Sequence, residues 1–235
     1  MITSKDQLVA AVSHELRTPM TSVVGLAREL DERFDDFSEA EVREFLGLIV
    51  HESTDVANIL EDLLVAARAD VGNLALSVVA VDIYAEIASA VNTTSSAQVK
   101  RHSPSEKLLV AADPMRVRQI LRNLIVNATR YGGPAVRVTV GSDDDLVAIT
   151  VCDDGQPIPQ DEREKIFLPY QGVRGSTYVP GSVGLGLTVS RQLARLMGGD
   201  LSYDYRDAES RFTLVIPRYR EASADDPAPS RADAA

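Results

Sequence analysis

Residues 5 to 30 read KDQLVAAVSHELRTPMTSVVGLAREL. Apolar side chains recur in this stretch at steps of three and four residues, which is the period of one helix face. These side chains are Val9, Val12, Leu16, Met20, Val23, Ala27 and Leu30. A second stripe with the same spacing runs from Val42 to Ala67, after a charged segment in which Ser38 is placed as an N-cap with Glu41 at the third helical position. The pattern predicts an antiparallel helical hairpin.

The two stripes also indicate how the hairpin is completed. Two helices alone bury too little apolar surface to be stable. Two such hairpins can pair into a four-helix bundle that covers both stripes. We therefore expect the chain to form a homodimer through this region.

One histidine of the first helix stands out because of its neighbours. His14 lies off the apolar stripe, and Thr18 follows one helical turn later on the same face. Pro19 removes the backbone hydrogen bond to the Glu15 carbonyl and should bend the helix there. Glu15 could accept the Nδ1 proton, which would leave Nε2 of His14 as a nucleophile. A lone histidine in this position is more often an ordinary surface residue, so its function depends on the whole string SHELRTP.

The chain after the hairpin alternates strand-like and helix-like segments. Two β-branched runs flank residues 141–145 and predict an antiparallel hairpin. Asp113 and Pro114 have the form of an N-cap followed by proline at the first helical position, and Gly198 with Gly199 is a natural helix stop. We predict strands at residues 74–81, 107–112, 136–140, 146–151, 201–205 and 211–216, helices at 82–96, 114–131, 163–167 and 185–197, and a mobile loop at 168–183. The predicted fold class is multidomain α and α+β: the helical hairpin is followed by an α/β sandwich in which helices cover one face of a mixed, largely antiparallel sheet.

The helix after Pro114 carries polar residues that suit nucleotide chemistry. Asn123 and Asn127 share a face, and Arg130 and Tyr131 follow them. Amide oxygens can ligate Mg²⁺, and a guanidinium can bind phosphate. Polar surface residues with no function would give the same pattern.

Two turns in the same block also suit a nucleotide. Asp153 ends a strand just before Gly155, where a carboxylate could accept a hydrogen bond from an adenine amino group. Gly181, Gly184 and Gly186 precede a helix whose N-terminus offers N–H donors to phosphate. Taken singly, these are a simple acidic turn and a weak glycine signal, and neither the dinucleotide-binding fingerprint nor a P-loop is present.

The composition excludes several classes of protein. The chain has 235 residues, a formal net charge of −11 and a pI near 4.8, so we expect no nucleic acid partner. One cysteine and three scattered histidines exclude a disulfide framework and a cysteine-rich zinc site. No apolar run approaches the roughly 18 residues of a membrane span, and residues 1–7 lack a signal-peptide core. We therefore expect a cytoplasmic location.

The charge is unevenly distributed along the chain. Residues 1–70 carry a net charge of −9, residues 71–220 one of +1 and residues 221–235 one of −3. These steps predict two domains, residues 1–70 and 71–220. The last segment has no large apolar residue, which predicts a disordered acidic tail.

The motifs occur in the order found in two-component sensor histidine kinases, and the resemblance covers residues 8 to 217. SHELRTP matches the phosphoacceptor box of that family at every position. The resemblance implies that His14 is autophosphorylated, that Glu15 assists as base, and that Thr18 positions a water for dephosphorylating a partner. It also implies a dimeric hairpin domain, a Bergerat-type ATP-binding sandwich, and phosphoryl transfer to an aspartate in a response regulator receiver domain.

The same resemblance implies roles for the nucleotide groups, with ATP and Mg²⁺ as the ligands. Residues 123–131 correspond to the N box, in which Asn127 would ligate Mg²⁺, and Asp153 matches the adenine-binding aspartate. Residues 166–170 resemble the F box, and the loop up to Val183 would be the ATP lid. The implied ATP-binding residues are Asn123, Asn127, Arg130, Tyr131, Asp153, Gly155, Arg174, Gly184, Leu185 and Gly186.

The chain departs from the family pattern at three places. Pro157 stands for a glycine of the first glycine box and stiffens that turn. Ser182 stands at the first glycine position of the second box, with Gly181 one residue earlier. Gln171 stands for the arginine after the F box, although Arg174 lies close in sequence. We expect catalysis to survive these changes, and nucleotide affinity is the property they would alter.

Two other functions stay open at this point. The departures could mark a nucleotide-sensing dimeric scaffold that binds a regulator without efficient phosphoryl transfer, although an intact SHELRTP argues against it. The other is a protein that acts mainly as a regulator phosphatase through Thr18. No sensor module precedes the first helix, and we favour the cytoplasmic core of a longer kinase, which a missing N-terminal region could anchor to a membrane, over input through a partner.

Overall fold

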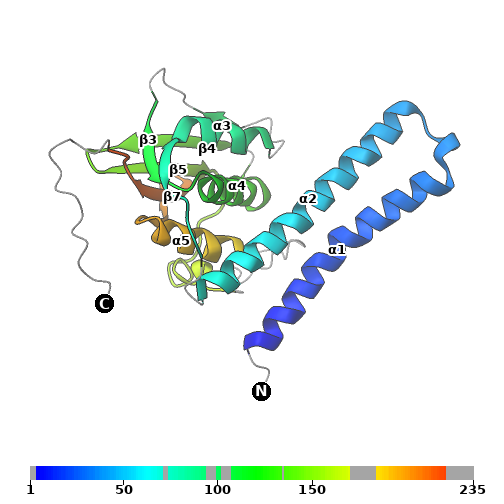
Figure 1. The fold of residues 1–235 in the computed structure, drawn as a ribbon, viewed down its shortest axis with the longest axis horizontal. Coiled ribbons are helices and arrows are strands. Elements are labelled where there is room, and N and C mark those ends of the chain that lie inside the picture. The colour runs from blue at the N-terminus through cyan, green and yellow to red at the C-terminus, as the bar shows by residue number, and fades with distance from the viewer. Residues whose placement is uncertain are drawn as a thin grey trace, which may run out of the picture.

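The computed structural model describes residues 4–70, 74–93, 99–101, 107–133, 135–169 and 184–220. A long helical hairpin lies against one side of an α/β sandwich, and the two helices extend well beyond it (Figure 1). The predicted ATP lid from residue 170 and the predicted disordered tail, residues 221–235, lie outside the described residues.

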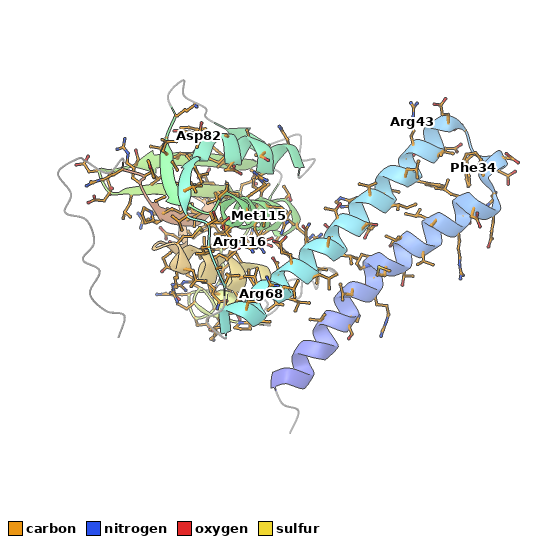
Figure 2. The ribbon with its side chains drawn as sticks, in the orientation of Figure 1. Phe34, Arg43, Arg68, Asp82, Met115 and Arg116 are labelled. Carbon is orange, nitrogen blue, oxygen red and sulfur yellow. The ribbon has the colours of Figure 1, made fainter. Side chains whose placement is uncertain are left out.

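The hairpin consists of α1 (Ser4–Glu32), a 3-10 turn η1 (Phe34–Asp36) and α2 (Glu39–Asp70). The predicted capping box at the start of α2 is confirmed. The Ser38 backbone N–H donates to the Glu41 carboxylate at 2.8 Å, and the Glu41 N–H donates to the Ser38 hydroxyl at 3.3 Å. Phe34 marks the tip of the hairpin, at the end remote from the sandwich (Figure 2).

Large apolar side chains of the hairpin are exposed in the single chain. On α1 and α2 they are Met20, Val24, Leu46, Leu48, Val50, Leu60 and Leu64, and Phe34 is exposed at the tip. Exposed apolar surface of this extent marks an interaction site on a protein. The homodimeric four-helix bundle therefore stays our prediction for what covers it.

The sandwich contains a five-stranded sheet with the strand order β2-β4-β5-β7-β6. Its pairs are antiparallel except β2 with β4, which is parallel. The strands are β2 (Val99–Arg101), β4 (Val136–Ser142), β5 (Leu146–Asp153), β6 (Asp200–Arg206) and β7 (Glu209–Pro217). A separate antiparallel pair joins β1 (Val79–Asp82) to β3 (Leu109–Ala112).

One face of the sheet forms the core. Every second residue of β7 is buried, which is the alternation of a strand packed on one side. Three helices supply the other half of the core: α3 (Ile83–Thr93), α4 (Pro114–Tyr131) and α5 (Gly186–Leu196). The predicted cap of α4 is present, because Asp113 accepts hydrogen bonds from the Met115 N–H at 2.9 Å and the Arg116 N–H at 3.3 Å. The mixed, largely antiparallel α/β fold is thus confirmed.

Two local predictions were wrong or incomplete, and a third is refined. Residues 74–78 form no strand, and the backbone N–H of Ser77 donates to the Asp113 carboxylate at 3.0 Å in place of a sheet partner. The strand β2 was not predicted, since only three residues pair and they pair with a strand far along the chain. The short helix expected to end at Phe167 is present as a single 3-10 turn, η2 (Lys165–Phe167).

The end of α2 belongs to the core of the sandwich. Val65 is 2% exposed and is part of the buried cluster formed by the sheet and its helices. Leu63 and Ala66 pack against the same cluster. The hairpin and the sandwich are therefore joined by a packed helix end.

Candidate functional site

The SHELRTP segment, residues 13–19, lies near the middle of α1. His14 and Thr18 are both exposed and are spaced by one helical turn, so they lie on the same face. Pro19 is buried, and α1 continues through it as one helix from Ser4 to Glu32. The His14 side chain is thus exposed on the surface of a continuous helix.

Asp153 lies at the carboxyl end of β5, where the strand meets the end of α4. Its side chain is buried, with 5% of the residue exposed, and its Oδ1 accepts a hydrogen bond from the Gly155 N–H at 2.9 Å. Burial raises the pKa of the Asp153 carboxyl, and the hydrogen bond from Gly155 opposes that change. A carboxylate held in this way can accept a hydrogen bond from a donor of the ligand.

Glycines make the close approach around Asp153 possible. A Cβ atom on Gly132, just after α4, would lie 2.6 Å from the Cβ of Asp153. A Cβ atom on Gly155 would lie 2.7 Å from Asp153 Oδ1 and 2.8 Å from the Cα of Gly132. The end of α4 and the turn after β5 therefore pack backbone against backbone around one carboxylate.

Gly132→Ala should lower the stability of the sandwich by about 1–3 kcal/mol, because the added methyl overpacks this junction. The expected result is an earlier midpoint in urea and weaker ATP binding. Gly141→Ala is the matched control, since nothing lies within 4 Å of a Cβ atom there. Equal midpoints for the two variants would show that the junction is loose.

The turn that follows Asp153 is fixed to the sheet. The neighbouring Asp154 is exposed and accepts a hydrogen bond from the Ala135 N–H at 3.0 Å. The Ile158 N–H, directly after Pro157, donates to the Tyr203 hydroxyl at 3.0 Å. The Arg163 guanidinium donates to the Ile158 carbonyl at 3.2 Å. The proline that departs from the family pattern thus sits in a turn with further anchors.

The predicted residues of α4 have different surroundings. Asn123 donates from Nδ2 to the Gly186 carbonyl and to the Ser190 hydroxyl, each at 3.4 Å, and so links α4 to α5. Asn127 lies one turn further along and is half-buried. Arg130 is 3.6 Å from the Asp55 carboxylate of α2, and Tyr131 is exposed.

The start of α5 is built for close approach to the backbone. Gly184 has a φ of 66°, in the left-handed region that favours glycine. Leu185 is buried and fixes the entry of the chain, and Gly186 is the first residue of α5. No side chain caps this helix end in the described structure, which leaves the N–H groups of its first turn without a capping partner from the N-cap side chain.

Two parts of the predicted site lie outside the described residues. They are Arg174 with the rest of the lid, and the departures Gln171 and Ser182. Of the F box, Ile166 and Phe167 are buried in the sandwich, and the Arg191 guanidinium lies 4.6 Å from the centroid of the Phe167 ring. The structure therefore brings Asp153 together with the end of α4, and the start of α5 together with Asn123 in the middle of α4, while His14 lies on the hairpin.

Sequence reasoning missed the polar contacts between α2 and α4. Arg116 pairs with Glu61 at 2.8 Å, Gln119 donates to Asp62 at 2.7 Å, and Arg122 donates to Asn58. The only available signal was a row of polar residues at helical spacing, which ordinary solvated helix faces also show.

Comparison with known protein families gives two matches, one for the hairpin and one for the sandwich. Residues 4–72 match the His Kinase A (phospho-acceptor) domain, and residues 112–220 match the histidine kinase-, DNA gyrase B- and HSP90-like ATPase family. The chain is a two-component histidine kinase core. The helical hairpin of this kinase core is thus the phosphoacceptor-type region, and its sandwich is the ATPase-type region.

Curated relatives include a histidine-protein kinase and a sensor protein. The kinase core is 29% identical over 230 residues to the signal transduction histidine-protein kinase AfsQ2 of Streptomyces coelicolor, a match that covers 94% of this chain and 43% of the relative. It is 35% identical over 226 residues to the aerobic respiration control sensor protein ArcB of Escherichia coli, covering 90% of this chain and 28% of that one. The chain thus spans less than half of the length of these relatives.

Solved structures share the fold. ShkA, solved at full length in complex with AMPPNP, gives a TM-score of 0.61 at 26% identity and covers 94% of this chain and 47% of that one. The Acinetobacter baumannii histidine kinase AdeS gives a TM-score of 0.59 at 22% identity, over 88% and 98% of the two chains. Within the described residues, no helix has the length and apolarity that crossing a membrane requires.

Proposed function

We propose that this kinase core uses ATP to phosphorylate His14 and passes the phosphoryl group to an aspartate in the receiver domain of a response regulator. The observation that carries the proposal is the presence, in one chain, of an exposed His14 in SHELRTP and of a buried, glycine-lined Asp153 at the end of α4. The first offers a nucleophile, and the second suits an adenine nucleotide. The domain boundaries at residues 70 and 220 are part of this proposal.

The sandwich binds and orients the nucleotide. Asp153 accepts a hydrogen bond from the adenine amino group, while the N–H groups at Gly184, Leu185 and Gly186 and the Arg130 guanidinium face phosphate oxygens. Tyr131, Gly155 and Arg174 complete the set. In this proposal ATP is a substrate, the phosphoryl donor, and not a resident cofactor.

Asn127 is the residue that would hold Mg²⁺. Its amide oxygen suits that ion, which keeps several waters and takes one or two protein ligands together with substrate phosphates. When bound, Mg²⁺ neutralises charge on the phosphates during transfer.

The hairpin supplies the acceptor. Nε2 of His14 attacks the γ-phosphorus as the bond to the β–γ bridging oxygen breaks, which leaves ADP and a phosphohistidine. Glu15 takes the Nδ1 proton. In the view of Figure 1, α2 lies between α1 and the α4–α5 layer, so transfer within one chain requires the sandwich to swing. The His14 of a dimer mate is the other acceptor.

The regulator is proposed to dock on the homodimeric hairpin. Residues 1–70 carry a net charge of −9, which favours a regulator with a neutral or basic contact surface and an association that weakens as salt rises. Thr18 lies exposed one turn from His14, where it can position a water for dephosphorylating the regulator. This geometry favours regulator phosphatase activity as a second function of the same helix.

Incubating the chain with Mg²⁺ and ATP that carries ³²P at the γ-position tests the proposal. We expect a label that is stable in base and lost in acid, as a phosphoramidate is. Adding a receiver domain should then remove the label from the kinase. A chain that binds ATP but gains no label would favour the scaffold, and dephosphorylation of the regulator without labelling would favour the phosphatase.

Asn127→Asp should abolish autophosphorylation while the fold is kept, because it puts a negative charge beside the phosphates and alters the Mg²⁺ ligand. The measurement is ³²P incorporation alongside circular dichroism. Asn92→Asp on α3 is the control, because Asn92 is exposed and lies on a different helix. Normal labelling of Asn127→Asp would reject the metal role.

A further inference from the structure

Four residues of α2 form a polar row that faces α4. We name Asp55, Asn58, Glu61 and Asp62 the α2 polar row. Asp55, Asn58 and Asp62 are spaced by three and four residues, so they share one helix face. This face differs from the one that carries the apolar stripe through Phe45, Ile49 and Val56, so the row stays available in a dimer built on that stripe.

The row pairs with α4 along much of its length. Asp55 lies opposite Arg130 near the end of α4, while Glu61 pairs with Arg116 near its start. Asn58 accepts a hydrogen bond from Arg122 between these two ends. Figure 2 shows Arg116 on the part of the sandwich that lies next to α2. The contact is therefore a continuous polar interface between α2 of the hairpin and α4 of the sandwich.

Asp62 is the residue of the row whose carboxylate is buried without a close ion-pair partner. Its Oδ1 accepts a hydrogen bond from Gln119 at 2.7 Å, but the nearest guanidinium nitrogen, on Arg122, is 4.0 Å away. Burial raises the pKa of the Asp62 carboxyl, against the opposing effects of Gln119, Arg122 and Asn123. The buried Arg122 Nη2 has no hydrogen-bond partner among the described residues. Such a desolvated, incompletely paired contact is costly to keep closed.

The row occupies residues that the nucleotide needs. Arg130 faces Asp55, whereas the proposed function gives the same guanidinium to phosphate. The Asp62 Oδ2 lies 3.9 Å from the place where a Cβ atom of Gly186 would stand, close to Asn123 and to the start of α5. Two carboxylates of the hairpin thus stand beside the proposed phosphate-binding groups, where their negative charges oppose those of ATP.

We propose that the α2 polar row is an autoinhibitory contact that competes with ATP for α4 and the start of α5. The inference rests on the proposed ATP site. When the row is docked, Arg130 is paired with Asp55 and two carboxylates repel the phosphates. When ATP binds, Arg130 turns to phosphate and the row is released, which removes the polar contacts that hold α4 against α2 on the hairpin side of Val65.

ATP affinity of the whole chain with Mg²⁺, measured by titration calorimetry, tests the competition. Asp55→Ala removes the carboxylate that faces Arg130, and Asn58→Lys opens the row by placing a cation beside Arg122. We expect each to lower the Kd for ATP by about twofold to fivefold, the scale of a partly exposed ion pair. Glu44→Ala is the matched control, because Glu44 is an exposed acid nearer the hairpin tip on the same helix.

The outcomes separate this inference from the proposed function. Tighter ATP binding in Asp55→Ala and Asn58→Lys, with Glu44→Ala unchanged, supports the competition. Unchanged or weaker binding in both row variants, in a chain that still binds ATP, overturns it and leaves the proposed function standing. Failure of the wild-type chain and every variant to bind ATP would overturn the proposed function itself.

Discussion

The His14→Gln variant is expected to gain no acid-labile label from ATP, with incorporation falling to the background of the assay. Glutamine is polar and close in size, but its amide nitrogen is not a nucleophile at neutral pH, so no phosphohistidine can form. The α1 helix should be unchanged, since His14 is exposed. The measurement is ³²P incorporation at fixed ATP, followed by acid and base treatment of the labelled protein.

His51→Gln provides the matched control for that experiment. His51 is also exposed and also lies within a hairpin helix, on α2, so the same substitution tests the chemistry of a second imidazole. Its label should equal that of the wild type. Acid-labile label that persists in His14→Gln, or disappears in His51→Gln, would contradict the assignment of the phosphoacceptor.

Asp153→Asn is expected to weaken ATP binding by about 10-fold to 100-fold, the worth of roughly 1.5–3 kcal/mol for a hydrogen bond to a charged group. The amide can still accept the hydrogen bond from the Gly155 N–H, so the turn should survive. What is lost is a negatively charged acceptor for the adenine amino group. Binding of ATP measured by calorimetry, together with the urea midpoint, separates this loss from unfolding.

Asp154→Asn is the control for Asp153→Asn. Asp154 is adjacent in sequence but exposed, and its carboxylate accepts from the Ala135 N–H on the strand side of the turn. Its substitution should leave the Kd for ATP within about twofold of the wild type, as for a surface change that touches no ligand. Equal losses in both variants would mean that the turn as a whole, and no single carboxylate, governs affinity.

Local signals in the sequence predicted the parts of the fold that depend on neighbouring residues. The Ser38–Glu41 capping box and the Asp113 cap were predictable because each joins residues within one helical turn. The β4–β5 hairpin followed from two β-branched runs with a short polar connection. The candidate site residues Asp153, Gly155 and Gly186 were found because each lies at the end of such an element.

Contacts between distant segments could not be predicted in the same way. The three residues of β2 are polar or β-branched like many loops, and only their pairing with β4 makes them a strand. Gln119 and Asp62 are separated by 57 residues, and nothing in either helix specifies the other as its partner. The close packing of Gly132 on Asp153 had one weak signal in the sequence, namely the two glycines directly after Tyr131. The sequence-based prediction did not use it.

The packing of Val65 sets where the kinase core can bend. Because Val65 and its neighbours on α2 are embedded in the sandwich, a pivot placed at residue 70 would leave the last turns of the helix fixed to the part that moves. Any swing must therefore either bend α2 on the hairpin side of Val65 or withdraw Val65 from the core. Because the end of α2 is rigidly attached to the sandwich, rotation of α2 about its own axis would rotate the sandwich with it.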